Sequence, residues 1–285
     1  MNVALIGSGS WGTAVAGLAA ARAVRVTMWP IASRRPPALT VSTATPATLW
    51  LRAAEQRGSN DRTRPGARRC RCDHLCRALH ALARRVPSGS ALYRRRYPGA
   101  LPHQGIEPES GLLMSEVIAN EIGNEARVAA LSGPNHAEEI CRGGLSAAVI
   151  ASKDAQVGET FKNLLLSTAF RIYLSQDMTG VEVCGAMKNV IAIVCGISAG
   201  TGAGDNTLAL IMTRGLAEIS RLVHARGGQA MTCMGLAGMG DLIATCTSEH
   251  SRNRTFGYEF AHGVSLDEYQ TRTHMVVEGA SRPAA

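Results

Sequence analysis

The chain has 285 residues, 46% of them hydrophobic, which is enough for one large domain or two ordinary domains with cores of their own. We expect no membrane span, because no apolar run reaches the roughly 18 residues that one needs, and no signal peptide, because the chain opens on an apolar strand pattern. Eight cysteines without a secretory signal then predict reduced thiols and a cytoplasmic location.

Positive charge is concentrated in one part of the chain. The net charge of +8 suggests an anionic partner, but residues 31–100 alone hold 15 arginines against three acidic residues. The other residues sum to a negative charge. The basic character therefore describes one segment and not the whole protein.

Residues 1–29 carry the pattern of a βαβ unit. The strand "NVALI" precedes the glycine turn "GSGSWG", the alanine-rich helix "TAVAGLAAARA" and a second strand, "VRVTMW". The turn holds Gly7, Gly9 and Gly12 in G-x-G-x-x-G spacing. The first glycine permits the tight turn, the second lets a pyrophosphate approach the backbone, and the third lets helix and strand pack closely. The pattern predicts dinucleotide binding at the helix N-terminus, against the alternative of an ordinary glycine turn.

The cofactor's ribose has no obvious partner in the sequence. An Asp or Glu that binds the 2′-hydroxyl would stand just after the second strand, where this chain reads "WPIASRR". The sequence therefore leaves NAD and NADP open.

Residues 30–104 lack any apolar period, and three interpretations compete for them. The first is an arginine-rich disordered insert that binds a polyanion. The second is a small metal site in "CRCDHLCRALH", although its C-x-C-x3-C spacing lacks the usual C-x2-C pair, and we predict no metal. The third, which we favour, is a segment translated out of frame.

Regular patterns return at Gly105 and continue to residue 274. We expect, in chain order, a helix over 109–122, the strand "RVAAL", a loop and helix in "SGPNHAEEICRG", the strand "SAAVIAS", a helix over 154–167, the strand "FRIYLS", helices over 180–198 and 206–226, and shorter helices after them. A boundary near residue 176 would divide an α/β Rossmann-like N-terminal domain, residues 1–176, from an all-α C-terminal domain, residues 177–285.

Lys188 lies in the middle of a helix that is apolar on nearly every side, "GVEVCGAMKNVIAIVCGISAG". Lysine is seldom buried unless it is paired or functional. The chain has 27 arginines and three lysines, so a lysine kept here indicates a group that must be able to lose its proton. The alternative is a lysine that extends its amine to solvent from a helix end, and the mid-helix position argues against it.

Further polar residues gather in "GLAGMGDLIATCTSEHSRNRTFG". Asp241 and Thr245 are one helical turn apart, and Asp241 could pair with a buried lysine or serve as a helix cap. Ser251, Arg252 and Asn253 form a compact set suited to an anion, because the arginine fork matches phosphate geometry; the alternative is a solvated basic loop.

These motifs resemble the bacterial NAD(P)-dependent sn-glycerol-3-phosphate dehydrogenases over residues 1–29 and 105–279. The same resemblance extends to "GIEPESGLLMSEV", "LSGPNHAEEI", "GDNTLALIMTRGLAEISRL" and "VVEG". The resemblance implies a Rossmann domain, a helical domain and an active site between them. It implies reversible hydride transfer between NAD or NADP and glycerol 3-phosphate or dihydroxyacetone phosphate, for phospholipid synthesis in the cytoplasm. It implies a small-molecule substrate and a possible homodimer, with no nucleic acid.

The resemblance also implies a role for individual residues. Lys188 corresponds to the catalytic proton donor or acceptor, and Asp241 to the acid beside it. The implied substrate contacts are Gly133, Asn135, Lys188, Asp241, Ser251, Arg252 and Asn253. The implied cofactor contacts are Gly7, Gly9, Ser10, Trp11, Gly12, Ala137, Arg252, Val276 and Glu278.

Three departures from the family limit the expected activity. The apolar strands of residues 30–104 are missing although the spacing is preserved, as compensating frameshifts would produce. Gln104 stands where the family has a lysine that contacts cofactor and substrate. The chain ends at "VVEGASRPAA", before the family's last helices. We therefore expect this polypeptide to fold poorly and to be nearly inactive. The second hypothesis is a catalytically inactive Rossmann-helical protein whose arginine-rich segment binds a polyanion.

Overall fold

The computed structural model describes most of the chain from residue 105 onward and parts of it before. The described residues are 2–6, 10–22, 25–29, 39–41, 99–101, 105–107, 110–273, 275 and 277–280. Gly7, Gly9, Gln104, Val276 and the cysteine cluster at 70–76 lie outside them, so the predictions made for those residues have no structural counterpart here.

The N-terminal domain contains strands and helices in the order that the sequence predicts. Its elements are β1 (Asn2–Ile6), α1 (Ser10–Ala20), β2 (Arg25–Trp29), β3 (Leu39–Val41), β4 (Gly99–Leu101), α5 (Met114–Ile122), the 3-10 turn η1 (Glu125–Arg127), β5 (Val128–Ser132), α6 (Ala137–Cys141), β6 (Ser146–Ser152), α7 (Ala155–Leu165) and β7 (Phe170–Ser175). The opening βαβ unit is confirmed, because β1 and β2 pair in parallel across α1.

The strands form two sheets among the described residues. One has the order β1-β2-β3, and β2 and β3 run antiparallel. The other has the order β4-β5-β6-β7, in which β5 and β6 are antiparallel and the outer pairs are parallel. β3 and β4 belong to residues 30–104, where we expected no strand. Each strand has three residues, too few to leave a period in the sequence.

One predicted boundary is wrong. The helix expected from residue 109 begins at Met114, because the residues before it form a closed turn. An isolated antiparallel bridge joins Ile106 to Leu113, and the Glu107 carboxylate accepts hydrogen bonds from the Ser110 backbone N–H and hydroxyl, both at 2.6 Å. Backbone N–H and C=O groups before Met114 are hydrogen-bonded within this turn, so they are not available to extend the helix toward the N-terminus.

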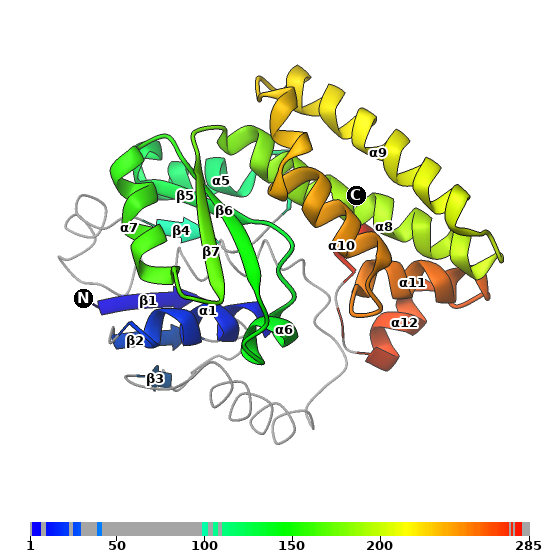
Figure 1. Ribbon diagram of the computed structural model, residues 1–285, viewed down its shortest axis with the longest axis horizontal. Helices are drawn as coiled ribbons and strands as arrows, with labels where there is room; N and C mark the ends of the chain where they lie inside the picture. Colours follow the sequence, from blue (N-terminus) through cyan, green and yellow to red (C-terminus); the bar gives the residue numbers. More distant parts are fainter. Residues whose placement is uncertain are drawn as a thin grey trace.

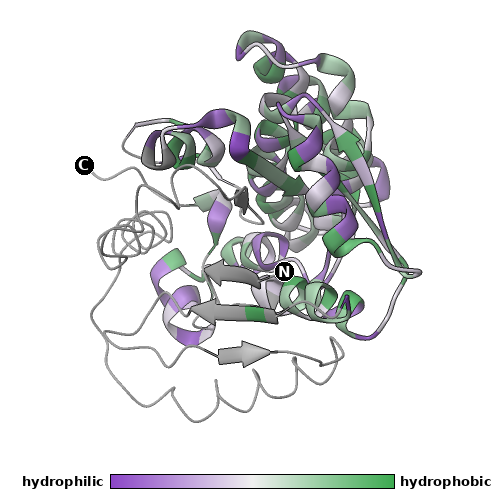
Figure 2. Cartoon of the chain, turned by 90° about the vertical axis from the view of Figure 1, so that its left-hand side faces the viewer, coloured by the Kyte–Doolittle hydropathy of each residue, from purple (hydrophilic) through white to green (hydrophobic). Residues whose placement is uncertain are grey.

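The C-terminal domain is helical and packs around one long central helix (Figure 1). Its elements are α8 (Met178–Gly200), α9 (Asp205–Ala225), the 3-10 turn η2 (Ala230–Met234), the π-helical turn η3 (Leu236–Gly240), α10 (Asp241–Thr247), α11 (Arg252–Ala261), α12 (Leu266–Thr273) and the 3-10 turn η4 (Glu278–Ala280). Figure 2 shows hydrophobic and hydrophilic residues intermixed over the helices of this part of the molecule.

By length and composition, α8 is long and apolar enough to cross a membrane. This corrects the expectation that no apolar run in the chain is long enough for a membrane span. Glu182 and Lys188 interrupt its apolar run, so the run was not recognised in the sequence. The central helix of a soluble protein passes the same test. α9, α10 and α11 pack on α8, and Lys188 in its middle forms an ion pair with α10, so α8 acts as a core helix here.

Two glycines let α11 lie against α8 at backbone distance. A Cβ atom on Gly196 would lie 2.0 Å from the Arg254 carbonyl oxygen, and one on Gly257 would lie 2.1 Å from the Ile193 carbonyl oxygen. No other residue type fits at either position without moving the helices apart. This crossing brings the start of α11 next to the middle of α8, where Lys188 lies.

Candidate active site

Lys188 and Asp241 form a buried ion pair between α8 and α10. The Lys188 Nζ lies 2.5 Å from Asp241 Oδ2, and the two residues are 9% and 2% exposed. Asp241 is the first residue of α10, directly after η3, and the Thr245 hydroxyl donates to its backbone carbonyl at 2.6 Å. A buried charge is tolerated only with a partner, so each residue compensates the other's burial and holds it in a fixed position.

A second polar network begins at the next residue of α8. Asn189 Oδ1 accepts from Asn253 Nδ2 at 3.1 Å, and Asn189 Nδ2 donates to Glu278 Oε2 at 3.3 Å. The Gly279 N–H donates to Asn253 Oδ1 at 3.0 Å, and Arg252 Nη2 lies 3.6 Å from Glu278 Oε1. The network joins α8, α11 and η4, and it brings together Arg252, Asn253 and Glu278 from the predicted site.

The polar set Ser251, Arg252 and Asn253 forms the beginning of α11. Ser251 is the N-cap, and its hydroxyl accepts from the Arg254 N–H. Ser251 and Asn253 are 5% and 7% exposed, so the stretch is not a solvated loop. Arg252 keeps 39% of its side chain exposed, which leaves its guanidinium accessible to an anion.

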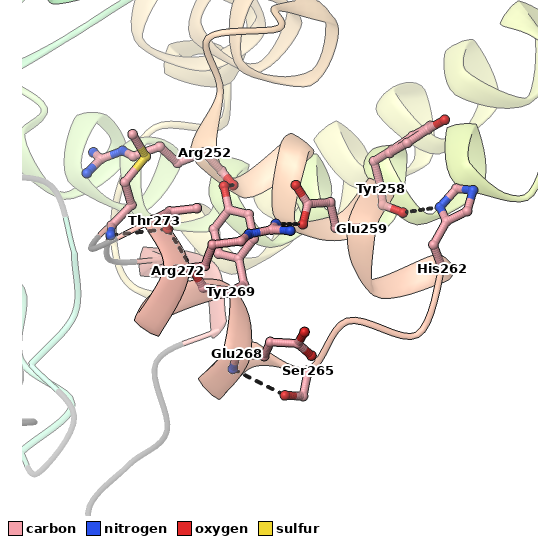
Figure 3. Close-up of polar contacts among 10 residues, drawn as sticks. Arg252, Tyr258, Glu259, His262, Ser265, Glu268, Tyr269, Arg272 and Thr273 are labelled. Atoms are coloured by element: carbon pink, nitrogen blue, oxygen red, sulfur yellow. Dashed lines mark hydrogen bonds and ion pairs between the residues drawn. The ribbon is translucent and has the colours of Figure 1, made fainter.

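α12 supports the backbone at Arg252 (Figure 3). The Tyr269 hydroxyl donates to the Arg252 carbonyl at 3.5 Å, and Arg272 of α12 pairs with Glu259 of α11. Tyr269 is 2% exposed and packs edge-on against Phe256, with ring centroids 5.4 Å apart. Burial, followed by the charge of Glu259, raises the pKa of Tyr269, so its hydroxyl remains a donor at neutral pH.

The loop between β5 and α6 supplies Gly133 and Asn135. Gly133 has φ of +144°, and a Cβ there would lie 3.0 Å from the Ala147 carbonyl oxygen, so the loop needs glycine at this position. Asn135 Oδ1 and His136 Nε2 are buried without a hydrogen-bond partner in the part of the chain that the structure describes. These are the polar atoms that a bound ligand would satisfy.

This loop lies against the helical domain at two points. The Pro134 Cδ atom is 3.9 Å from the position of a Cβ on Gly240, the residue before Asp241. The rings of His136 and His250 meet edge to face with centroids 6.2 Å apart, and His250 precedes the cap of α11. The predicted substrate residues of the two domains are thus neighbours at the seam between them.

The predicted cofactor residues lie mainly at the beginning of two helices. Ser10, Trp11 and Gly12 form the first turn of α1, the helix that follows β1 in the chain, and Ala137 is the first residue of α6. The first turn of α1 carries no acidic residue that would repel a phosphate. The backbone arrangement therefore fits a dinucleotide, and Glu278 lies beside Arg252 on the helical side.

Sequence analysis missed two polar groups in this region. Asn189 was noticed beside Lys188 but received no role, and the structure makes it the centre of the second network. Glu182 received no role either, although it is 3% exposed. The signal that singled out Lys188, a polar residue within an apolar helix, applied equally to both.

An α/β domain with a glycine turn, joined to a helical domain with a buried lysine–carboxylate pair, is the architecture of a nucleotide-dependent dehydrogenase. The comparisons with known proteins give the family. The family model of the NAD-dependent glycerol-3-phosphate dehydrogenase N-terminus matches residues 2–47 and 80–158, and that of the C-terminus matches residues 177–284. The chain belongs to the NAD-dependent glycerol-3-phosphate dehydrogenase family.

Individual relatives agree with this assignment. The glycerol-3-phosphate dehydrogenase [NAD(P)+] of Chlorobium luteolum is 39% identical, over 98% of this chain and 85% of the relative. That of Corynebacterium diphtheriae is 40% identical over the same shares of the two chains. The crystal structure of glycerol-3-phosphate dehydrogenase from Coxiella burnetii superposes with a TM-score of 0.75 at 32% identity, covering 98% of this chain and 85% of that chain.

Proposed function

We propose that this chain is an NAD(P)-dependent oxidoreductase that interconverts sn-glycerol 3-phosphate and dihydroxyacetone phosphate. Its physiological direction is reduction of the ketone, in the cytoplasm, to supply backbones for phospholipids. The observation that carries the proposal is the buried Lys188–Asp241 pair, 2.5 Å apart, at the seam with the nucleotide-binding domain. We further propose that the enzyme is a homodimer and binds no nucleic acid.

The pair suits proton transfer at the substrate's C2 oxygen. A nicotinamide cofactor held at the beginning of α1 and α6 would supply or accept the hydride. When the ketone is reduced, its oxygen takes up a proton, and the Lys188 ammonium is the donor within the pair. Asp241 stabilises the charged lysine and fixes its direction. In the oxidation direction the neutral amine accepts the hydroxyl proton, which an arginine could not do.

The phosphate of the substrate has partners at the beginning of α11. The Arg252 guanidinium is partly exposed, and its neighbours Ser251 and Asn253 are held by the cap and by the second network. A guanidinium binds phosphate through two parallel N–H donors, so Arg252 would hold the substrate while Lys188 acts on C2. Asn135 Oδ1 can accept a hydrogen bond from a substrate hydroxyl.

The direct test is oxidation of NADH or NADPH in the presence of dihydroxyacetone phosphate, followed at 340 nm. Turnover that saturates with the ketone and is absent without it supports the proposal. Binding to nucleic acid that weakens steeply with salt, without turnover, would instead favour the inactive polyanion-binding protein.

Gln104 supplies a sharper form of the same test. It stands where the family has a lysine that contacts cofactor and substrate, although it lies outside the described residues. We expect the wild-type chain to turn over well below about 10 per second, and Gln104→Lys to raise kcat/KM. An equal rate for both proteins would contradict this.

We also propose that residues 30–104 are translated out of frame. The family model passes over residues 48–79, which supports the proposal for that part of the segment, whereas its match to residues 30–47 and 80–104 counts against a shifted frame there. The nucleotide sequence decides the question. A shifted frame should encode apolar strands and a lysine at position 104, and a frame that encodes neither would refute the proposal.

A further inference from the structure

Glu182 is a buried carboxylate that the proposed chemistry does not use. It lies on α8, six residues before Lys188, and is 3% exposed. Its Oε1 accepts from the Ser115 backbone N–H at 2.9 Å, and its Oε2 accepts from the Ser115 hydroxyl in a short hydrogen bond. Both side chains are buried, so the contact forms within the protein interior and not at its surface.

The contact joins the two domains. Ser115 is the second residue of α5 in the nucleotide-binding domain, where backbone N–H groups have no partner within the helix. The N-terminus of a helix favours a carboxylate, and here the carboxylate comes from α8 of the other domain. Around it, Met114 and Ile118 of α5 pack with Met178 and Val181 of α8.

We propose that Glu182 is a positioning residue, whose carboxylate ties α8 to the beginning of α5 and so sets where Lys188 stands relative to the nucleotide-binding domain. This inference rests on the proposed function, because it concerns the same lysine. Six residues correspond to roughly 9 Å along the helix, so a small shift of α8 at Glu182 displaces Lys188 by a similar amount. A misplacement of about 1 Å costs on the order of a hundredfold in rate.

Burial and hydrogen bonding have opposite effects on the pKa of Glu182. Burial raises the pKa of Glu182 from 4.5 to about 7, and the two hydrogen bonds from Ser115 oppose that rise. The Glu116 carboxylate of α5 adds a smaller rise. The contact therefore changes its charge near neutral pH, where an ordinary glutamate would be fully ionised.

Few other charges act on this position. Among the elements that pack on α8, β5, β6, η2 and η3 contain no acidic, basic or histidine residue, and their titratable group is the Cys233 thiol. α9 also packs on α8 and carries His224 in its last turn, followed by Arg226. Asp177, the cap of α8, accepts from the Gly180 and Gln229 N–H groups and from the Thr232 hydroxyl. Lys188 and Asp241 neutralise each other further along the helix.

The sign of the pH effect on stability follows from the raised pKa. Between pH 4.5 and about 7 the folded protein holds a proton on Glu182 that the unfolded chain releases. Stability from this group is fully present below pH 4.5, falls as the pH rises to about 7, and stays at the lower level above it. Glu182→Gln keeps a neutral acceptor at the position and removes this dependence.

The test compares wild type with Glu182→Gln, Ser115→Ala and the double variant, with Glu218→Gln on exposed α9 as the control. We expect each single variant to lower kcat about tenfold with KM within twofold, and the double variant to be no slower than the slower single, because the two side chains act as one contact. Additive losses, or an unchanged kcat in both single variants, would overturn the proposal.

Thermal unfolding separates this inference from the proposed function. The melting temperature of Glu182→Gln should equal that of wild type at pH 4 and exceed it by several degrees at pH 8, while the control tracks wild type at both. That difference can be measured without any turnover. Absence of activity in both the wild type and Gln104→Lys refutes the proposed function alone, and a melting-temperature difference that does not change with pH refutes the role of Glu182.

Discussion

The two sides of the active site differ in how their polar groups are satisfied. On the helical side, Asp241 binds both Lys188 and Thr245, and Asn189 joins Asn253 and Glu278. The one buried polar side-chain atom of that side without a partner in the described part of the chain is Arg254 Nε, which lies outside these two networks. On the loop between β5 and α6, Asn135 Oδ1 and His136 Nε2 are buried without a partner in the described part of the chain. The helical side is therefore preorganised by the protein itself, whereas the loop side is completed by what it binds.

This difference separates two kinds of mutational effect. A change on the helical side breaks interactions within the protein, so it should cost both stability and kcat. A change on the loop side removes a contact that exists only with ligand, so it should raise KM and leave stability almost unchanged. The predictions below follow that order, from the largest expected effect to the smallest.

Lys188→Ala should have the largest effect. Loss of the proton donor should lower kcat by about a hundredfold to ten-thousandfold. Because Asp241 is then left buried and uncompensated, the free energy of unfolding should fall by about 3–5 kcal/mol. Steady-state kinetics and urea unfolding measure the two losses, and Lys162→Ala, a lysine on the outer side of α7, serves as the control.

A second variant distinguishes the chemistry from the folding effect. Lys188→Met combined with Asp241→Leu replaces the buried pair with apolar side chains of similar size, which should recover most of the lost stability. The double variant should remain inactive. Recovery of turnover along with stability would mean that Lys188 has no chemical role.

Gly257→Ala should break the helix crossing that brings α11 to α8. The added Cβ would lie 2.1 Å from the Ile193 carbonyl oxygen, so the helices must separate, at a cost of about 1–3 kcal/mol. The beginning of α11 moves with the helix, so KM for dihydroxyacetone phosphate should rise as well. Gly204→Ala is the matched control, because nothing lies within 4 Å of its Cβ position.

The contact of α11 with α8 illustrates why some features of the structure were predicted from the sequence and others were not. The order of elements, the lysine in an apolar helix and the Asp241–Thr245 turn depend on spacing along one segment, and such spacing is visible in the sequence. The Ser115–Glu182 bond joins residues 67 positions apart, and the Asn189–Asn253 bond between α8 and α11 joins residues 64 positions apart. Those pairs follow from how the helices cross, which a local pattern does not encode. The short strands β3 and β4 escaped detection for a related reason, because three residues depend on their sheet partners and not on their own pattern.

Asn135→Ala tests the loop side. The truncation removes a buried acceptor that has no partner within the described protein, so the free energy of unfolding should stay the same or rise. KM for the ketone should increase about tenfold, the size expected for one hydrogen bond, while kcat changes little. Asn120→Ala on the exposed side of α5 is the control. A loss of stability as large as that of Lys188→Ala would remove the distinction between the two sides.

The smallest expected effect concerns thiol reactivity. The rate at which buried cysteines are alkylated measures how often the helical side of the active site opens to solvent. Cys184 and Cys233 have their sulfur atoms 3.5 Å apart between α8 and η2, and both residues are at most 1% exposed. Burial, followed by the neighbouring Cys233 thiol, raises the pKa of Cys184. The hydrogen bond with Cys195 and burial raise that of Cys246, which lies on α10 five residues after Asp241. Because the thiolate is the species that is alkylated, both groups should resist iodoacetamide in the native protein and react once it is unfolded.

Mass spectrometry of the alkylated peptides measures this protection at each cysteine separately. Gly257→Ala provides the internal comparison, because the added Cβ displaces α11 from α8 at Ile193 and Ile197, on either side of Cys195, whose thiol is hydrogen-bonded to that of Cys246. The Cys184–Cys233 pair lies earlier along α8, between α8 and η2. We therefore expect faster labelling of Cys246 than of Cys184 in that variant. If Cys184 and Cys246 are alkylated in the wild type as fast as an exposed cysteine, the helical side opens in solution, and its preorganisation cannot explain how Lys188 is kept in place.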